Sequence, residues 1–370
     1  MKEQLVQVID KKDLQVLILT DGYNIHHLSG YRGHTGMLVA FQGEQYILTD
    51  SRYTEQVELE APEFTCVDIG REGYSKTIAA MVQKAFAKEG RSTLRIGFEN
   101  KEISYMQYQA FVDTFAKELT GMQVEFVPLE DAVNVYREVK TEDEIAKLAR
   151  AEQIGDEAFT EIVKFIHENW KDGLTEQRVA LQLEYEMRLR GAEGTSFDTI
   201  AASGSNSSLP HAMPQPKLLT EGDFLTMDFG CMYQGYCSDM TRTIHIGEVV
   251  ESEQKKVYDT VLQAQLAALS VVKPGMVCSD VDKCARDIIA DAGYGDYFGH
   301  GLGHSVGLFI HEEPRFSMKC DAVLKPGVVI TVEPGIYLPG RFGVRIEDMI
   351  VVMEDGYQNL ASSPKELICV

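Results

Sequence analysis

Residues 219–230 read LTEGDFLTMDFG, and residues 324–335 read LKPGVVITVEPG. The two segments match without a gap at Leu, Gly, Thr, an acid and a final Gly. In each segment a turn opens a short β-branched and aromatic run that ends in an acid, Asp228 or Glu333. This composition is typical of a strand that follows a turn. We interpret the pair as an internal duplication that gives two similar halves.

Each half supplies a second acid beyond a turn. Asp239 follows YQGY at residues 233–236, and Glu347 follows LPGRFG at residues 338–343. Both stretches have hairpin-turn composition, so we expect two acids on adjacent antiparallel strands in each half. A single Asp or Glu is most often a solvated surface residue. Four carboxylates in matched positions would repel one another strongly, and a shared cation is the simpler way to stabilise them.

Length and charge limit the class of protein. The chain has 370 residues, of which 44% are hydrophobic, and this length predicts two domains. A net charge of −22 argues against binding to nucleic acid or to an anionic membrane surface. The apolar run at residues 14–19 is too short for a signal sequence or a membrane span. The seven cysteines form no CxxC pair, so we expect reduced thiols in a cytoplasmic protein.

The first 130 residues predict an α/β domain, with a boundary near residue 130. Alternating or continuous apolar runs indicate strands at residues 14–20, 36–41, 45–49, 94–98 and 124–128. Helical periodicity appears at residues 75–88 and 104–119. Asp50 and Arg52 form a charged pair that we interpret as a structural salt bridge.

The second domain, residues 131–370, is predicted to repeat one order of elements. Thr141 and Glu144 match a capping box, and Thr175 caps a second helix before the first acid hairpin. Two further helices, at residues 252–272 and 279–292, precede the second acid hairpin. The order helix, helix, strands therefore occurs twice, as a duplicated half would give.

Histidines are concentrated near the second acid pair. His300 and His304 lie in GHGLGHSVG, residues 299–307, with the four-residue spacing of a helical zinc pair. The glycines of this segment each cost a helix ~1 kcal/mol relative to Ala. We therefore expect an extended segment in which His300 and His304 share a face and His311 lies on the other face or beyond a bend. His211, in a loop rich in Ser, Gly, Asn and Pro at residues 195–216, can reach into a cleft.

Four carboxylates and one histidine make a hard, oxygen-dominated site. Such a site selects Mn²⁺ or Co²⁺ more naturally than a structural zinc ion. Two ions bridged by carboxylates, ~3.5–4 Å apart, would use all four acids and acidify a water for attack on a carbonyl. Histidines that bind no metal could then stabilise the oxyanion and transfer protons. The residues therefore predict metal-assisted hydrolysis.

Five motifs together resemble the pita-bread metallopeptidases, which include aminopeptidase P, prolidase and methionine aminopeptidase. They are MDFG at 227–230, SDMTR at 238–242, HGLGHSVG at 300–307, TVEPGIY at 331–337 and VRIED at 344–348. The resemblance implies a pita-bread domain with an internal pseudo-two-fold axis, preceded by a creatinase-like N-terminal α/β domain. It also implies two divalent ions, Mn²⁺ first and Co²⁺ or Zn²⁺ as alternatives, held by five ligands: Asp228, Asp239, His304, Glu333 and Glu347.

The resemblance implies further site residues. Glu333 would also help to activate the bridging water, and His211 and His311 would contact the scissile carbonyl and the tetrahedral intermediate. The bond before proline lacks an N–H group, so its recognition must use ring packing and flanking groups. The residues implied at the proline end and near the metal ligands are His300, Arg345 and Tyr337.

The predicted activity is that of an Xaa-Pro aminopeptidase, acting on peptides with proline in the second position. The N-terminal domain argues against methionine aminopeptidase, and the complete ligand set argues against creatinase. One alternative is a prolidase that splits Xaa-Pro dipeptides; another is a non-catalytic binding module on the same fold. A closed pocket with a basic group beyond proline would indicate a dipeptidase, and an open groove an aminopeptidase. The resemblance also implies a homodimer.

Overall fold

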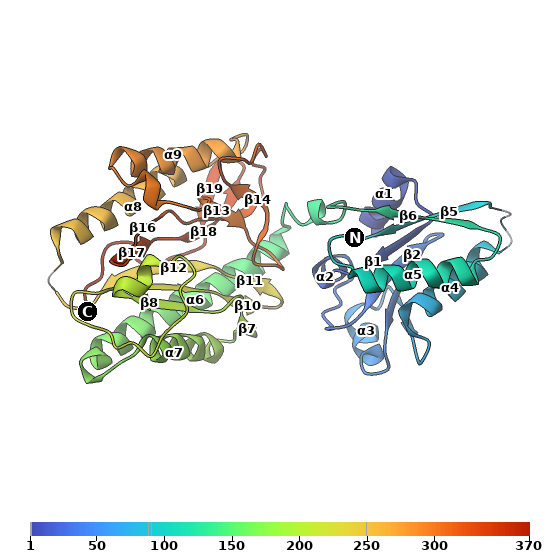
Figure 1. Cartoon of the computed structure of the whole chain (residues 1–370), viewed down its shortest axis with the longest axis horizontal. Coiled ribbons are helices and arrows are strands. Elements are labelled where there is room, and N and C mark those ends of the chain that lie inside the picture. The colour runs from blue at the N-terminus through green and yellow to red at the C-terminus, as the bar shows by residue number, and fades with distance from the viewer. Residues whose placement is uncertain (1, 88, 90, 249) are drawn as a thin grey trace. The chain divides into compact units, whose positions relative to one another are not determined.

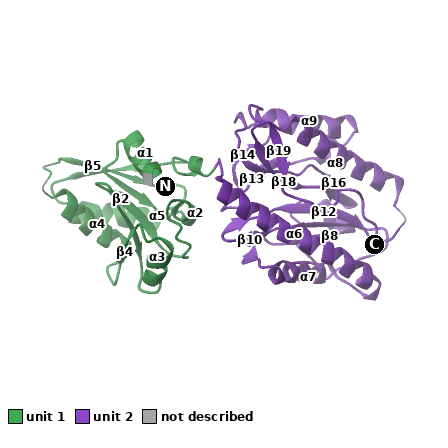
Figure 2. Cartoon of the chain, turned by 180° about the vertical axis from the view of Figure 1, so that it is seen from behind, with its two compact units in different colours: residues 1–137 green, residues 138–370 purple. Residues whose placement is uncertain are grey.

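The computed structural model of the chain describes residues 2–87, 89, 91–248 and 250–370. It contains two compact units, residues 1–137 and 138–370 (Figures 1 and 2). The division falls several residues beyond the boundary near residue 130 expected from the sequence. Leu129 and Val133 are buried in the core of the first unit, and Arg137 pairs with Asp21 at 3.4 Å. These contacts make the segment after residue 130 part of the first unit.

The first unit is an α/β domain built on a mixed sheet in the order β4-β3-β2-β1-β5-β6. Its helices are α1 (Lys2–Lys12), α2 (Gly22–Ser29), α3 (Thr54–Glu60), α4 (Gly73–Phe86) and α5 (Tyr105–Glu118). Its strands are β1 (Val16–Leu19), β2 (Met37–Phe41), β3 (Glu44–Thr49), β4 (Thr65–Asp68), β5 (Thr93–Phe98) and β6 (Gln123–Pro128).

The central strand β1 explains why the sequence shows a continuous apolar run. Leu17 and Leu19 belong to a core cluster with residues of α1, α2 and α3, whereas Val16 and Ile18 belong to a cluster with residues of α4 and α5. Successive side chains of a strand point to opposite faces, so a sheet covered on both faces needs apolar residues at every position.

Most predicted elements of the first unit are confirmed. The expected hairpin is β2 and β3, joined through Gln42 and Gly43, both with positive φ, as two-residue hairpin turns prefer. The predicted helices correspond to α4 and α5, although Lys88, at the predicted end of the first, lies outside the described residues. The salt bridge between Arg52 Nη2 and Asp50 Oδ2 is present at 2.8 Å.

The second unit follows the predicted order twice: two helices, then strands. The helices are α6 (Glu142–Asn169), α7 (Glu176–Leu189), α8 (Ser252–Val271) and α9 (Cys278–Asp291). The strands of the first half are β7 (Gly194–Thr195), β8 (Ile200–Ser203), β9 (Phe224–Phe229), β10 (Cys231–Tyr233), β11 (Tyr236–Cys237) and β12 (Met240–His245). Those of the second half are β13 (Gly303–Ser305), β14 (Glu312–Phe316), β15 (Val329–Val332), β16 (Gly335–Leu338), β17 (Phe342–Arg345), β18 (Asp348–Met353) and β19 (Gly356–Asn359).

The two halves have equivalent layers. β9 and β12 pack against α6 and α7, where the rings of Phe159 and Phe229 stack with centroids 6.4 Å apart. β15 and β18 belong to a core cluster with residues of α8 and α9. In Figure 1 one helix pair lies below the strands of this unit and the other above them. The strand–hairpin–strand order recurs as β9 to β12 and β15 to β18, which confirms the predicted duplication.

The strand register differs between the two halves, in the pair β9 and β12 and in the pair β15 and β18. β15 pairs with β18 so that Val332 lies opposite Asp348, and Glu333 and Glu347 follow at the end of this ladder. In the first half Asp228 lies opposite Thr241, so its two acids are not directly paired. The duplicated sequence therefore gives a matched topology with unequal spacing of the acids.

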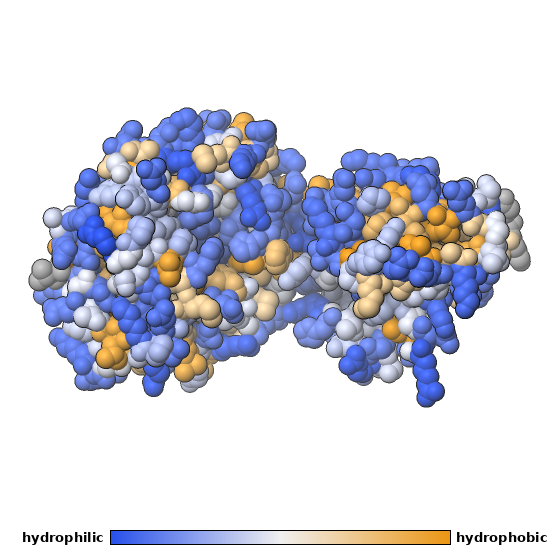
Figure 3. Space-filling model, in the orientation of Figure 1, coloured by the Kyte–Doolittle hydropathy of each residue, from blue (hydrophilic) through white to orange (hydrophobic). Residues whose placement is uncertain are grey.

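The surface is mostly hydrophilic in the view of Figure 3, with smaller hydrophobic areas between the polar ones. This agrees with the excess of acids over bases in the chain. Within the described residues, every helix is too short or too polar to cross a lipid bilayer.

Candidate active site

The acids found in the duplicated segments come together at the ends of strands. Asp228 lies on β9, Asp239 directly precedes β12, Glu333 directly follows β15 and Glu347 directly precedes β18. The backbone N–H of Glu347 donates to the carbonyl of Thr241 on β12 at 3.1 Å. This bond joins the two halves at the point where their acids meet.

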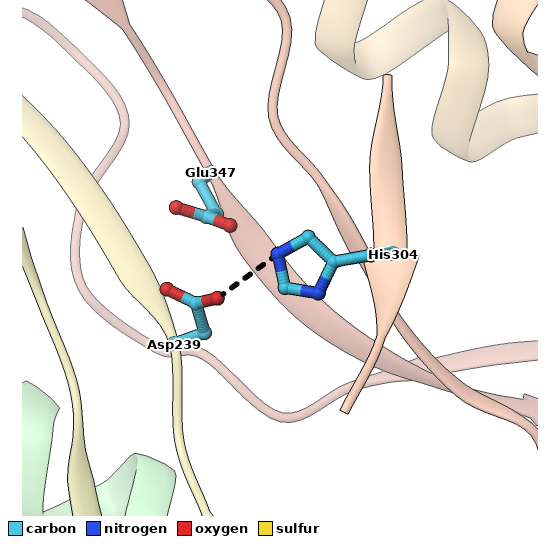
Figure 4. Close-up of side chains that lie close together, drawn as sticks. All are labelled: Asp239, His304 and Glu347. Carbon is cyan, nitrogen blue, oxygen red and sulfur yellow. Dashed lines mark ion pairs between the residues drawn. The ribbon is translucent and has the colours of Figure 1, made fainter. Parts of the chain in front are cut away.

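Three of the five predicted ligands form a tight cluster (Figure 4). One ligand atom each from Asp239, His304 and Glu347 lies within 4.8 Å of the other two. His304 Nε2 is 3.4 Å from Asp239 Oδ2 and 3.5 Å from Glu333 Oε1. The carboxylates and the imidazole therefore face one common centre from both halves of the unit.

Asp228 lines the same pocket as the clustered side chains. Its Oδ2 accepts a hydrogen bond from Arg345 Nη2 at 2.6 Å. Its Oδ1 is buried and has no hydrogen-bond partner among the described residues. A buried carboxylate oxygen without a donor is costly unless a cation or proton satisfies it.

Burial and mutual repulsion shift the carboxylates strongly. Burial, followed by the neighbouring carboxylates, raises the pKa of Asp239 and of Glu347 well above the ordinary range. Burial raises the pKa of Glu333 to about 8, with Asp228 adding to the rise and Arg345 opposing it. These shifts are those of buried carboxylates whose mutual repulsion the nearby positive charge does not offset.

The geometry of His304 shows what such a partner would be. Burial lowers its pKa to about 3, so the ring is neutral at pH 7. Nδ1 lies 3.2 Å from the carbonyl of Ser305, which can only accept, so Nδ1 carries the proton and Nε2 presents a lone pair. A lone pair that faces carboxylate oxygens is repelled unless a proton or a cation lies between them. Hard oxygen donors with one imidazole fit divalent metal ions at this centre.

Neighbouring side chains orient the ligands. Thr241 Oγ1 donates to Glu347 Oε2 at 2.6 Å, and Thr331 Oγ1 donates to Glu333 Oε1 at 3.3 Å. Such hydrogen bonds fix the direction of ligand carboxylates in metal sites. We did not expect them from the sequence, although both threonines lie in the motifs that carry the acids.

A buried ion pair lies next to the cluster and contacts the backbone of Glu347. Arg242 Nη2 donates to Asp348 Oδ1 at 2.8 Å, and Arg242 Nη1 donates to the carbonyl of Glu347. Both side chains are at most 2% exposed. On α6, Glu152 Oε2 accepts from the backbone N–H of Asp239 at 3.3 Å. Arg242 and Asp348 lie in the motifs SDMTR and VRIED, but we predicted no role for them or for Glu152, because the partners of buried acids and bases are not visible in the sequence.

The candidate ligands line a pocket of about 570 Å³. The predicted non-ligand histidines, His211, His300 and His311, line the same pocket, and so does Arg315. Apolar side chains complete the wall: Phe197, Ile200, Ala212, Ile310 and Phe316. The pocket thus combines polar groups of both signs with an apolar surface, as sites for small peptides require.

The histidine segment is extended, as predicted from its glycines. His304 lies on β13, and His300 precedes it. His311 lies beyond a bend, and its ring packs against that of His304 with centroids 4.5 Å apart. Burial, followed by the charge of Arg315, lowers the pKa of His311. Burial and then Arg345 lower the pKa of His300 to about 4, so both rings are neutral at pH 7.

Arg345 lines the pocket, and Tyr337, which is not among the lining residues, lies directly behind it in hydrogen-bond contact. Arg345 is 3% exposed; its Nη1 donates to Tyr337 Oη at 2.8 Å and to the carbonyl of Pro210 at 3.3 Å. His300 Nε2 lies 2.9 Å from the same Tyr337 oxygen. The residues predicted at the proline end thus form one connected network, anchored on Asp228 through the guanidinium.

Arg315 is a basic pocket residue that sequence reasoning missed. It lies on β14, where buried and exposed side chains alternate, and its own side chain is 47% exposed. Its Nε contacts Glu313 Oε1 at 3.0 Å, and the Glu313 side chain is 65% exposed. The sequence offered one signal for Arg315, its position four residues after His311. That spacing indicates a site residue only once the pocket is known.

Comparisons with known proteins agree with this geometry. Metallopeptidase family M24 matches residues 146–354, and the creatinase/prolidase N-terminal domain matches residues 2–139. The chain is 37% identical over 366 residues to an Xaa-Pro dipeptidase of Pyrococcus furiosus, covering 99% of both sequences.

Solved structures show the same relationship. An Xaa-Pro dipeptidase from Bacillus anthracis has a TM-score of 0.89 at 38% identity, covering 100% of this chain and 99% of the other. An X-Pro aminopeptidase from Thermotoga maritima has a TM-score of 0.86 at 34% identity, covering 98% and 100%. The predicted resemblance to the pita-bread group is confirmed. This chain belongs to metallopeptidase family M24 and carries the creatinase/prolidase-type N-terminal domain.

Proposed function

We propose that this metallopeptidase is an Xaa-Pro dipeptidase. From the sequence we predicted an Xaa-Pro aminopeptidase first and gave the dipeptidase as the alternative. The observation that carries the proposal is Arg315, a basic group in the pocket that holds the carboxylate cluster. A dipeptide ends in a free carboxylate directly after proline, which a guanidinium can bind in a bidentate geometry. Relatives named Xaa-Pro dipeptidase, covering nearly the whole chain, support the same choice.

We propose that two divalent ions, Mn²⁺ first, bind to a set of five ligands: Asp228, Asp239, His304, Glu333 and Glu347. When bound, such ions polarise the scissile carbonyl and acidify a water at neutral pH. Glu333 faces this centre from the end of β15, so its carboxylate would accept a proton from the attacking water. Its pKa, which burial raises to about 8, fits a group that loses a proton when a cation binds.

The remaining pocket residues take roles that agree with their positions. His311 is neutral at pH 7 and packs against His304, so its ring can hydrogen-bond to an oxyanion that develops beside the ligands. His211 lines the same pocket from another loop. The apolar wall would pack against the proline ring beside His300, whose Nε2 contacts Tyr337 Oη behind the lining residues.

An Xaa-Pro aminopeptidase is the second candidate, because one similar structure is an X-Pro aminopeptidase. The dipeptidase requires a free carboxylate on the proline, whereas the aminopeptidase accepts a further residue there. A series of Xaa-Pro, Xaa-Pro-amide and Xaa-Pro-Xaa substrates, assayed with Mn²⁺ and again after chelation, tests the proposal. We expect metal-dependent cleavage with a clear preference for the free dipeptide. Equal or faster cleavage of the longer peptides would establish the aminopeptidase instead.

Failure to cleave any of these peptides in the presence of metal would favour a non-catalytic binding module. The homodimer and the cytoplasmic location expected from the sequence remain predictions. Light scattering of the purified chain would test the first of them.

A further inference from the structure

The loop that carries His211 is fastened at both ends to one buried carboxylate. Glu176, the first residue of α7, is 0% exposed. Its Oε1 accepts from the N–H of Ser203 at 2.6 Å and from the Ser203 hydroxyl at 2.8 Å. Its Oε2 accepts from Asn206 Nδ2 at 2.8 Å and from the N–H of Gln215 at 2.9 Å. The donors lie before and after His211, so the carboxylate joins the two ends of the loop.

The other side of the loop rests on the strand that ends in Arg345. The Gly343 N–H donates to Ser207 Oγ at 2.9 Å, and Arg345 Nη1 donates to the carbonyl of Pro210 at 3.3 Å. His211 therefore comes directly after a carbonyl held by the arginine that also binds a candidate metal ligand. Its position in the pocket is set by Glu176 on one side and by β17 on the other.

We call the Glu176 carboxylate and its donors, which belong to Ser203, Asn206 and Gln215, the clamp. Its geometry requires a carboxylate rather than any polar side chain. Four donors converge on two oxygens, and an ionised carboxylate accepts all of them without donating. A glutamine would turn its amide hydrogens toward two of these donors. Lys217 Nζ donates to Ser203 Oγ at 2.7 Å and to Asp223 Oδ2 at 2.8 Å. The Ser203 hydroxyl thus connects Glu176 to a cation, which helps to stabilise the buried charge.

From this geometry we infer that Glu176 is a positioning residue, which fixes His211 for the hydrolysis reaction without contacting the substrate. The inference rests on the proposed function and on the proposed role of His211 in it. A carboxylate that only stabilised the packing of α7 would leave the catalytic effect of His211 unchanged. The two roles are therefore separable by asking whether Glu176 still matters after His211 has been removed.

A double-mutant cycle makes this separation. Glu176→Gln, His211→Ala and the double variant are compared with the wild type for kcat and KM on an Xaa-Pro dipeptide, bound Mn²⁺ and Tm. Losing hydrogen bonds to a charged group predicts a fall in kcat of roughly 10- to 100-fold for Glu176→Gln. We expect bound Mn²⁺ to stay the same and KM to change little. In the His211→Ala background the same substitution should change kcat by less than about twofold.

Controls keep each outcome decisive. Glu168→Gln, an exposed acid on α6, should leave kcat unchanged. Should Glu176→Gln fail to fold, Asn206→Ala removes one arm of the clamp and tests the same coupling with a smaller effect. Equal loss of kcat with and without His211, or wild-type kcat in Glu176→Gln, would overturn the inference while the proposed function stands. Absence of cleavage by the wild type would overturn both.

Discussion

Arg315 gives the sharpest test of how the pocket selects its substrate. We consider Arg315→Ala, which removes the guanidinium from the pocket and replaces none of the candidate metal ligands. Its ion-pair partner is the exposed Glu313, and within the described part of the chain Arg315 forms no ion pair with a candidate metal ligand. The substitution should therefore leave folding and metal content intact, and its effect should appear on the substrate.

The size of the effect depends on exposure. Hydrogen bonds to charged groups contribute about 1.5–3 kcal/mol, whereas fully exposed ion pairs contribute about 0.2–1 kcal/mol. The Arg315 side chain is 47% exposed, so we expect a value near the boundary of these ranges, about 1.4 kcal/mol. That free energy corresponds to a roughly tenfold fall in kcat/KM for an Xaa-Pro dipeptide.

The assay compares each dipeptide with its C-terminal amide, which has the same proline but no carboxylate. Arg315→Ala should lower kcat/KM about tenfold for the acid and little for the amide. Arg315→Lys should fall between wild type and Arg315→Ala, because lysine keeps the charge but not the bidentate geometry. Arg178→Ala, on the exposed face of α7, serves as the control. An equal loss on acid and amide would refute the assignment of Arg315 to the substrate carboxylate.

Three further outcomes are expected from the same contacts. Arg242→Met removes one of the two cations that contact the buried Asp348, the other being Lys365, and should lower the free energy of unfolding by about 1–3 kcal/mol in urea titrations. Arg341→Ala, which breaks the exposed pair with Glu253, should lower it far less, and similar losses would contradict the role of burial. Glu333→Ala should abolish dipeptide hydrolysis, measured at saturating substrate and Mn²⁺, and retained turnover would remove this residue from the mechanism. In the metal-free protein the pKa of Glu333 is raised from 4.5 to about 8; its protonated form therefore stabilises the fold fully below pH 4.5, and this contribution is lost as pH rises through about 8. Mn²⁺ should then raise Tm more at pH 8 than at pH 5, and an equal or larger rise at pH 5 would contradict this linkage.

The sequence was sufficient to predict the repeated parts of the fold. The two segments around Asp228 and Glu333 share apolar spacing and turn residues, and local propensity and tertiary structure agree in them. The glycines around His304 excluded a helix for a physical reason, the entropic cost of glycine, and β13 is a strand. The capping box at Thr141 likewise starts α6 as predicted, because its interactions are local.

The features that could not be predicted depend on contacts between distant residues. The duplicated acids suggested equal halves, but strand register differs between β9–β12 and β15–β18. Glu176 resembles an ordinary acid at a helix start until Ser203 and Gln215 are seen to surround it. Arg315 has the pattern of a solvent-facing strand residue, and only the folded structure shows that it lines the pocket. Charged groups acquire their roles from partners far away in sequence, and a single sequence carries no record of these partners.

The convergence of buried carboxylates around His304 is the basis for every functional step above. Its most direct test is a titration of Mn²⁺ into chelated protein, with bound metal and Xaa-Pro dipeptide hydrolysis measured on the same samples. We expect hydrolysis to be absent before the titration and to rise with metal bound, up to two ions per chain. Asp239→Asn should bind less metal and lose hydrolysis in proportion. Full hydrolysis by the chelated protein, or binding of Mn²⁺ that Asp239→Asn leaves unchanged, would contradict the proposed metal centre.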